Sequence, residues 1–255
     1  MLQTRVIPVL LLHNKGLVKT VRFKEPKYVG DPINAIKIFN EKEVDELIFL
    51  DIDASKEGRD PDYDLIARFA SECFMPVCYG GGIRNIEQIR NIFSLGIEKV
   101  SLNHSAIEDR DLIKEASAQF GAQSIIVAID VKKNFFGKYQ IYDHVSGKTR
   151  KEDMISYIKE VAELGAGELL INDVDRDGTQ KGYDLQLLKS VSEAVAIPVI
   201  ACGGAGSLED FKLAKQEGGI SAVAAGSFFV FHGRHRAVLI TYPKYEELEK
   251  LFGEK

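Results

Sequence analysis

The segment PVCYGGG at residues 76–82 returns as PVIACGG at residues 198–204, 122 positions further along the chain. Each copy is a short apolar run that stops at consecutive glycines. A helix-like stretch follows each copy, Asn85–Leu95 after the first and Ser207–Gln216 after the second. Strands buried on both faces and followed by amphipathic helices are typical of a parallel sheet covered by helices. The two segments therefore predict an α/β fold.

The offset of 122 residues also holds outside these segments. Acidic residues at the starts and ends of strands repeat with it: Glu46 with Glu168, Asp51 with Asp173, and Asp53 with Asp175. A constant spacing indicates a duplicated structural unit. We expect one domain, residues 1–255, made of two half-barrels at about 1–122 and 123–241, with a C-terminal helix at 242–255.

Eight strand-like runs occur along the chain, and helix-like stretches separate them. A chain of 255 residues has the length of one barrel domain. Eight such units within one domain favour closure into a (βα)8 TIM barrel over an open sheet. The predicted strands are Arg5–Leu12, Glu46–Asp51, Pro76–Tyr79, Lys99–Leu102, Ser124–Asp130, Glu168–Asp173, Pro198–Ala201 and Ala222–Ala225.

Composition narrows the class of protein. The net charge of −5 does not indicate a nucleic-acid-binding protein, because such proteins carry an excess of basic residues. No apolar run approaches the roughly 20 residues of a membrane span. Three cysteines are too few for a disulfide scaffold, and none forms a CxxC pair. We expect a cytoplasmic protein without nucleic-acid or membrane partners.

One segment interrupts the alternation of strands and helices. Residues 134–149 contain Tyr139–Tyr142 and Val145–Lys148, which predict a small hairpin after the fifth strand. The loops that follow strands of a barrel lie at its C-terminal face, where active sites are found. We expect this hairpin beside the site.

The glycine turns at residues 80–82 and 203–206 are the strongest candidates for binding chemistry. Glycine lets the backbone approach a ligand closely, so that amide N–H groups converge on an anion at a helix start. The alternative is a tight strand-to-helix turn without a ligand. Further turns, Asp177-Gly178-Thr179 and Ala225-Gly226-Ser227, favour an anion site in the second half, and Asn103 accompanies Gly82 in the first. Two anion sites suit a substrate with negative charge at both ends.

Asp130 closes the apolar run IIVAI at the end of the fifth strand. A carboxylate at this position is costly unless it is used or paired. General acid or base catalysis is one interpretation, and a buried ion pair with Lys132 or Lys19 is the other. The other aspartates at strand ends lack a metal-ligand spacing, so we expect no metal and no cofactor.

The histidines are weaker candidates for the functional site than the glycine turns and Asp130. His232 and His235 belong to the basic segment at residues 231–236, which could contact an anion or a partner, or form a solvated helix start. His13 and His104 follow strands and could line the mouth of the barrel.

With these motifs in place, the chain resembles the cyclase subunit (HisF type) of imidazole glycerol phosphate synthase over residues 1–231. That family is a two-fold repeated barrel that uses ammonia from a glutaminase on a substrate with two phosphates. The resemblance implies Asp130 as a catalytic residue. It implies phosphate or substrate binding by Lys19, Asp51, Gly82, Asn103, Asp177, Gly178, Gly203, Gly204, Gly226 and Ser227.

The resemblance also implies a partner. The family closes the lower end of its barrel with four charged residues that admit ammonia, and the matching residues here are Arg5, Glu46, Lys99 and Glu168. A HisH-like glutaminase would then dock on the N-terminal face. The alternative is a salt-bridge layer that only stabilises the barrel.

One position departs from the family pattern. The family uses a second aspartate at the end of the first strand, and Leu11 stands there. Leucine cannot exchange a proton, which puts classical cyclase activity in doubt; His13 is a conceivable substitute. With Leu11, residues 23–32 and residues 231–238, the chain looks like the paralogues of surface-polysaccharide synthesis.

These paralogues imply ammonia addition to an amide carbon of a nucleotide sugar, giving an acetamidino group, together with a sugar amidotransferase as a further partner. Three alternatives stay open: true cyclase activity in histidine synthesis, a non-catalytic scaffold for a glutaminase, and a sugar-phosphate isomerase on the same repeated barrel.

Overall fold

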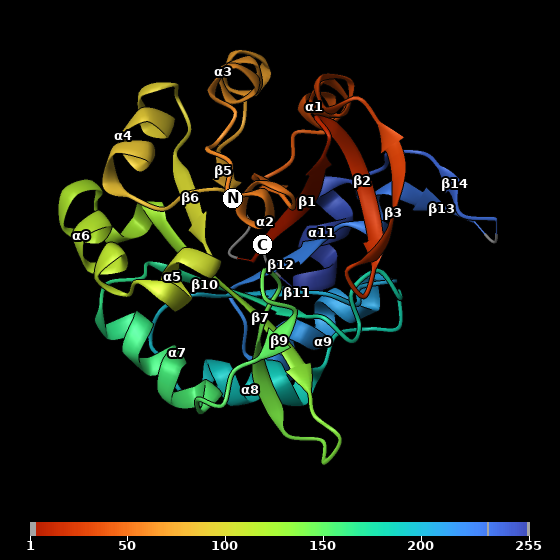
Figure 1. Ribbon diagram of the computed structural model, residues 1–255. Helices are drawn as coiled ribbons and strands as arrows, with labels where there is room; N and C mark the ends of the chain where they lie inside the picture. The colour runs from red at the N-terminus through yellow and green to blue at the C-terminus, as the bar shows by residue number, and fades with distance from the viewer. Residues whose placement is uncertain (1–3, 234, 254–255) are drawn as a thin grey trace.

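A closed ring of eight parallel strands forms the centre of the computed structural model, which describes residues 4–233 and 235–253 (Figure 1). Strand β1 closes the ring because it pairs with β12 through Arg5 and Ala222, and with β4 through Leu11 and Leu50. The (βα)8 barrel expected from the sequence is confirmed. In ring order the strands are β1 (Arg5–His13), β4 (Leu47–Asp51), β5 (Val77–Gly80), β6 (Lys99–Leu102), β7 (Ile125–Lys133), β10 (Glu168–Asp173), β11 (Val199–Cys202) and β12 (Ala222–Ala225).

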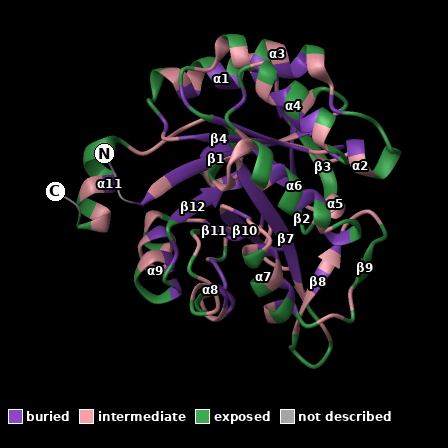
Figure 2. Cartoon of the chain, turned by 90° about the vertical axis from the view of Figure 1, so that its left-hand side faces the viewer, coloured by how far each residue is buried: buried purple, intermediate pink, exposed green. Residues whose placement is uncertain are grey.

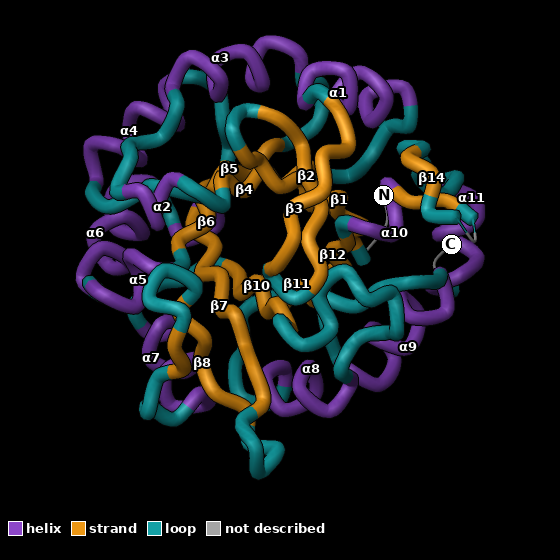
Figure 3. The backbone as a smooth tube through the Cα atoms, turned by 45° about the vertical axis from the view of Figure 1, so that its right-hand side comes forward, coloured by secondary structure: helices purple, strands orange, loops and turns teal. Residues whose placement is uncertain are grey.

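Helices surround the strands on the outside (Figure 3). Polar side chains fix where several of them begin: Asn85 Oδ1 accepts from the amide of Gln88, and Ser207 forms a capping box with Asp210. None of the helices in residues 4–233 and 235–253 is long and apolar enough to cross a membrane. The outer helices are α1 (Pro32–Glu41), α3 (Tyr63–Glu72), α4 (Ile86–Ser94), α6 (Asp111–Phe120), α7 (Met154–Glu163), α8 (Leu185–Ser192), α9 (Leu208–Gly218) and α11 (Tyr245–Phe252). Shorter helical turns are α2 (Ala54–Glu57), α5 (His104–Glu108), η1 (Ala122–Ser124) and α10 (Ser227–Val230).

Two apolar layers hold the barrel together. Side chains of a strand alternate between its two faces, so one set packs outward against the helices and the other fills the barrel. In the outer layer the rings of Phe49 and Phe69 stack with their centroids 4.3 Å apart. The inner layer contains Ile7, Ile126 and Leu170, all buried. Figure 2 shows the consequence: the strands of the barrel are mostly buried, and the outer faces of the helices are exposed.

The chain also forms hairpins at the C-terminal end of the barrel. The small hairpin expected within residues 134–149 is confirmed: β8 (Tyr139–Asp143) pairs with β9 (Lys148–Thr149). On its other edge β8 pairs with an extension of β7. Strand β7 therefore runs three residues past Asp130, because β8 supplies its hydrogen bonds.

A second hairpin was not expected from the sequence. It consists of β2 (Gly16–Val21) and β3 (Lys24–Gly30), and β2 pairs back onto β1. Five of the seven residues of β3 are exposed, so it lacks the apolar alternation that marks a strand.

The duplicated motifs adopt similar backbone conformations. Gly81 and Gly203 both have positive φ, +119° and +86°. The carboxylate of Asp51 accepts from the amide of Asp53, and Asp173 accepts from Asp175 in the same way. The division into half-barrels near residue 122 remains a prediction.

The C-terminal helix is shorter than the expected 242–255. Helix α11 begins at Tyr245, and residues 254–255 lie outside the described chain. Before it, the hydroxyl of Tyr242 donates to the carbonyl of Val6, 2.8 Å away, which ties this end of the chain to β1.

We predict that Gly81→Ala lowers the free energy of unfolding by roughly 2–4 kcal/mol, since a Cβ there combines an unfavourable φ with a steric clash. The added carbon would lie 2.5 Å from the carbonyl oxygen of Asp51. Gly147 also has positive φ but open space around it, so Gly147→Ala should cost only about 1 kcal/mol. Urea denaturation of both variants measures the difference, and equal losses would contradict the packing argument.

Candidate functional site

A pocket opens at the carboxyl ends of the barrel strands, and its walls come from every part of the ring. All of the predicted catalytic and substrate-binding residues line it, although they are scattered over 209 positions of sequence from Lys19 to Ser227. These residues are Lys19, Asp51, Gly82, Asn103, Asp130, Asp177, Gly178, Gly203, Gly204, Gly226 and Ser227. The geometry thus brings the predicted residues together, while their roles remain predictions.

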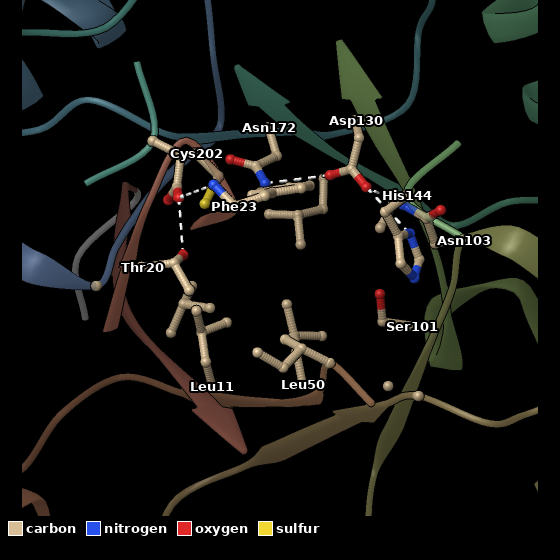
Figure 4. Close-up of a pocket in the computed structure, with 18 of the residues that line it drawn as sticks. Leu11, Thr20, Phe23, Leu50, Ser101, Asn103, Asp130, His144, Asn172 and Cys202 are labelled. Carbon is tan, nitrogen blue, oxygen red and sulfur yellow. Dashed lines mark hydrogen bonds and ion pairs between the residues drawn. The ribbon is translucent and has the colours of Figure 1, made fainter. Parts of the chain in front are cut away.

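Asp130 is held by two amide side chains. Asn103 Nδ2 donates to Asp130 Oδ2 over 3.0 Å, and Asn172 Nδ2 donates to Asp130 Oδ1 over 3.1 Å (Figure 4). The register of the barrel arranges this, because Asp130 and Asn172 are partners on β7 and β10. An ion pair of Asp130 with Lys132 or Lys19 is wrong: Lys132 lies over the ring of Tyr142, and Lys19 donates to the carbonyl of Val9.

The pocket has one polar and one apolar wall. Asn103, Asp130 and Asn172 belong to the polar wall (Figure 4). Leu11 and Leu50, neighbours across β1 and β4, project into the pocket on the other side. A carboxylate and two amide side chains on the β6–β7–β10 side thus face two leucines across the pocket.

The first predicted anion site lies around Gly82. Its amide donates to Ser55 Oγ over 3.2 Å, and its φ of +74° suits glycine. A Cβ on Gly82 would lie 2.6 Å from the carbonyl of Arg59. Asp51, predicted to bind substrate, accepts from the amide of Ala54 at the start of α2. Its carboxylate therefore also shapes this part of the rim.

The second predicted anion site contains a buried cation. Lys19 is 4% exposed, and its Nζ would lie 2.7 Å from a Cβ on Gly226. Burial lowers the pKa of Lys19 to about 8, and the nearby Asp177 offsets this only in part. Gly204 approaches Gly182 closely, because its carbonyl accepts from that residue's amide over 2.8 Å. A cation beside glycine backbone is suited to an anionic ligand.

Asp177 links this site to the unexpected β2–β3 hairpin. Thr20 Oγ1 donates to Asp177 Oδ2 over 3.0 Å, and the amide of Arg22 donates to the carbonyl of Asp177. Burial raises the pKa of Asp177. Gly178 fits beneath the hairpin, since a Cβ there would lie 2.0 Å from the carbonyl of Thr20. The turn at Asp177 and Gly178 therefore also positions the hairpin.

Cys202 also lines the pocket, on the same side as Lys19. Burial raises the pKa of its thiol to about 12. Such a thiol is a poor nucleophile near neutral pH, because the thiolate is the reactive form. A buried free cysteine of this kind behaves as a small apolar packing residue.

Four charged residues form a closed ring at the opposite, N-terminal end of the barrel. Arg5 Nη1 lies 2.6 Å from Glu46 Oε2, and the Arg5 guanidinium also contacts Glu168. Lys99 Nζ lies 3.0 Å from Glu46 Oε2 and 2.7 Å from Glu168 Oε1. Each base thus contacts both acids.

Contacts within the ring offset the effect of burial on the pKa values of Arg5, Lys99 and Glu168. Burial alone would lower the pKa of Arg5 and Lys99, but their contacts with Glu168 and Glu46 outweigh it and raise both pKa values. Burial likewise opposes ionisation of Glu168, yet Arg5 and Lys99 lower its pKa. Paired in this way, charges can be accommodated in the barrel floor. This geometry agrees with both interpretations of the ring, a gate for ammonia and a salt-bridge layer that only stabilises the barrel.

The sequence analysis missed a pocket residue on the inserted hairpin. His144 lies in the turn between β8 and β9, and its Nδ1 is 3.5 Å from Asp130 Oδ2. No motif marked it, because the pairing of β8 with β7 brings it to the pocket. His13 instead pairs with Asp53 over 2.9 Å, and neither is among the described residues that line the pocket.

One group of described residues has donor atoms close enough for a metal ion. The donor atoms of His104, Glu108 and Asp143 lie within 4.8 Å of one another. Protein partners already occupy them: His104 Nδ1 is 3.0 Å from Asp143 Oδ1, and Arg150 Nη1 is 3.3 Å from Glu108. We assign no metal there.

The basic segment at residues 231–236 does not start a helix, so that expectation is wrong. Strand β13 (Phe231–His232) pairs with β14 (Ala237–Val238), and His232 is exposed. Arg236 lies over the ring of Phe231. Residue 234 lies outside the described chain.

We predict that sulfate binding weakens as the pH rises from 7 to 9. Lys19, with its pKa of about 8, is mainly charged at pH 7 and mainly neutral at pH 9, so the Kd should rise roughly tenfold. Sulfate keeps its charge over this range, and calorimetric titration measures the Kd. Lys19→Gln should bind weakly at both pH values, whereas Lys15→Gln, at an exposed lysine, should retain the wild-type trend. A wild-type Kd that does not change with pH contradicts the role of Lys19.

Comparison with known proteins agrees with this geometry. The sequence model of the histidine biosynthesis protein family matches residues 5–236. The chain is 54% identical over 249 residues to a Pseudomonas aeruginosa protein with the provisional name imidazole glycerol phosphate synthase subunit hisF2, covering 98% of this chain and 99% of that protein. It is 47% identical to the imidazole glycerol phosphate synthase subunit HisF of Endomicrobium trichonymphae, covering 90% and 88%, and 41% identical to that of Alkaliphilus metalliredigens, covering 91% and 92%. The chain therefore belongs to the histidine biosynthesis protein family, among the HisF-type cyclase subunits of imidazole glycerol phosphate synthase.

Proposed function

We propose that this protein is the ammonia-using synthase subunit of a glutamine amidotransferase, and that it forms an acetamidino group on a nucleotide sugar for surface polysaccharide. Ammonia released by a HisH-like glutaminase on the N-terminal face enters through the ring of Arg5, Glu46, Lys99 and Glu168. It reaches the substrate in the pocket at the opposite end. A sugar amidotransferase is the further partner.

The arrangement of charged and apolar layers supports ammonia transfer. The ring lies at the strand starts, and the pocket lies at the strand ends. Between them the barrel is filled by apolar side chains such as Ile48, Ile126 and Leu170. Neutral ammonia crosses such a layer more readily than ammonium, because burying an unpaired charge is costly.

The pocket itself supports a phosphorylated substrate. Lys19 lines one part of the pocket together with the glycine turns, and Gly82 lines another part together with Asn103. A nucleotide sugar carries phosphates and therefore can use the same positions.

The observation that carries the choice of reaction is Leu11. It faces the pocket from the end of β1, at the place where the resemblance implies the second aspartate of the cyclase. An apolar side chain cannot transfer a proton there. This favours a substrate other than that of histidine synthesis.

Cyclase activity in histidine synthesis is the second candidate. The names of the relatives from Endomicrobium trichonymphae and Alkaliphilus metalliredigens favour it. Asp130, Lys19 and the glycine turns serve this reaction equally well, and another group would then replace the lost carboxylate.

We predict that the purified protein, supplied with ammonia, turns over an acetamido nucleotide sugar in the presence of its sugar amidotransferase and leaves the histidine-pathway substrate unchanged. Chromatography with mass detection measures both products. Turnover of the histidine-pathway substrate at ordinary cyclase rates would overturn the proposal.

Asp130→Asn should lower product formation roughly 10²-fold or more if Asp130 takes part in proton transfer; an unchanged rate would favour the scaffold alternative.

We predict that Lys99→Met reduces glutamine-dependent turnover but preserves turnover with added ammonia. The variant removes one base of the ring, whereas free ammonia can enter from the C-terminal mouth. The two nitrogen sources are compared in one assay with the glutaminase present, and Lys42→Met, at an exposed lysine, is the matched control. An equal loss with both sources indicates that the ring only stabilises the barrel.

A further inference from the structure

The hairpin of β8 and β9 brings a histidine to the polar wall of the pocket. His144 follows β8, and its side chain is 18% exposed. Figure 4 shows its ring projecting into the pocket between Asp130 and Ser101. A ring nitrogen in this place can reach a ligand that occupies the pocket.

The nearest charged group to this ring is the carboxylate of Asp130. His144 Nδ1 lies 3.5 Å from Asp130 Oδ2, and within the described chain Nδ1 has no hydrogen-bond partner. Contacts between catalytic groups are often this long before a substrate binds. Asp143, the adjacent acid, is already bound by His104. Asp130 is therefore the carboxylate available to His144.

The bonding of Asp130 suits it to orient a histidine. Both of its oxygens accept from amide groups, one from Asn103 and one from Asn172. Such a carboxylate is fixed in position as a hydrogen-bond acceptor. A buried aspartate of this kind fixes the tautomer of a neighbouring imidazole and stabilises it when it becomes charged.

Unpartnered polar atoms around the pair indicate that a ligand belongs there. Ser101 is 4% exposed, and its Oγ has no partner within the described chain. The same is true of Asn103 Oδ1 and Asn172 Oδ1. Buried polar atoms normally have partners, and these three residues line the same pocket.

We propose that His144 is a catalytic residue of this site and that Asp130 positions its imidazole with the proton on Nδ1, leaving the Nε2 lone pair directed at the substrate. His144 then supplies the second proton-transferring group that Leu11 cannot supply. This inference rests on the proposed ammonia transfer and adds the residue that moves the proton.

In the proposed reaction His144 carries protons from ammonia to the leaving oxygen. The ammonia nitrogen forms a bond to an electrophilic carbon of the substrate, and one N–H proton passes to His144 Nε2. Asp130 stabilises the resulting imidazolium. The imidazolium then gives this proton to the oxygen bound to that carbon, and a second N–H proton follows the same route. The oxygen leaves as water when its bond to the carbon breaks, and a C=N bond remains. The histidine returns to its neutral form, and no oxidant or reductant is needed.

The chain contains a matched control pair. His13 Nδ1 lies 2.9 Å from Asp53 at the same end of the barrel, so it has the same partner type at a shorter distance. Neither residue is among the described residues lining the pocket. A general effect of removing a histidine–aspartate pair should appear in both places, and a catalytic effect only at His144.

The first test is kinetic and uses the full chain with ammonia and the substrate that the wild type converts. His144→Gln and His144→Ala should lower kcat by about 10²- to 10³-fold, with little change in KM. Added imidazole should restore part of kcat in His144→Ala, because it can occupy the vacated space, and His13→Gln should match the wild type. A wild-type kcat in His144→Gln, or a loss that imidazole does not restore in His144→Ala, overturns the inference.

The second test does not depend on turnover. In protein labelled with ¹⁵N-histidine, the ring nitrogens of His144 should show the proton on Nδ1, and Asp130→Ala or Asp130→Asn should change these signals. Asp53→Ala should change only those of His13. If the ring signals of His144 do not change in either Asp130 variant, the proposed pairing of His144 with Asp130 is wrong. If neither candidate substrate is converted but the ring signals of His144 change in the Asp130 variants, the proposed reaction is wrong while the pairing of His144 with Asp130 is supported.

Discussion

The pairing of β1 with β12 is the constraint on which the rest of the structure depends. Arg5 and Ala222 are register partners although they lie at opposite ends of the chain, and their pairing turns the sheet into a ring. In a closed parallel ring all strands begin at one end and finish at the other. Residues that follow strands therefore meet in one pocket, and residues that begin strands meet in one floor.

The two ends of the barrel accommodate charge in different ways. In the floor, Arg5 and Lys99 each contact Glu46 and Glu168, so burial is compensated and the pKa of Glu168 falls. At the mouth, Lys19 forms no ion pair with another described residue, donates to the carbonyl of Val9 instead, and has a lowered pKa. Compensated charges suit a stable floor, whereas an uncompensated cation suits a bound anion.

The two hairpins place residues in the pocket that the barrel strands alone do not supply. The β2–β3 hairpin is tied to Asp177 beside the second anion site. The β7–β8 pairing brings His144 to the polar wall, opposite the apolar wall that contains Leu11. A loop at the C-terminal face can change the chemistry of a barrel without disturbing its core, because the core is formed by the strands and helices beneath it.

The sequence by itself determined the barrel and most of the pocket residues. Its repeated apolar runs and glycine turns specify strand ends, since burial periodicity and backbone freedom are local properties that each segment carries. Only the tertiary structure decided what these residues contact. Asp130 bonds to Asn103 and Asn172 rather than to a lysine, and His144 joins it from the turn after β8. These contacts depend on strand register and on the path of an exposed hairpin, and neither leaves a periodic pattern in the chain.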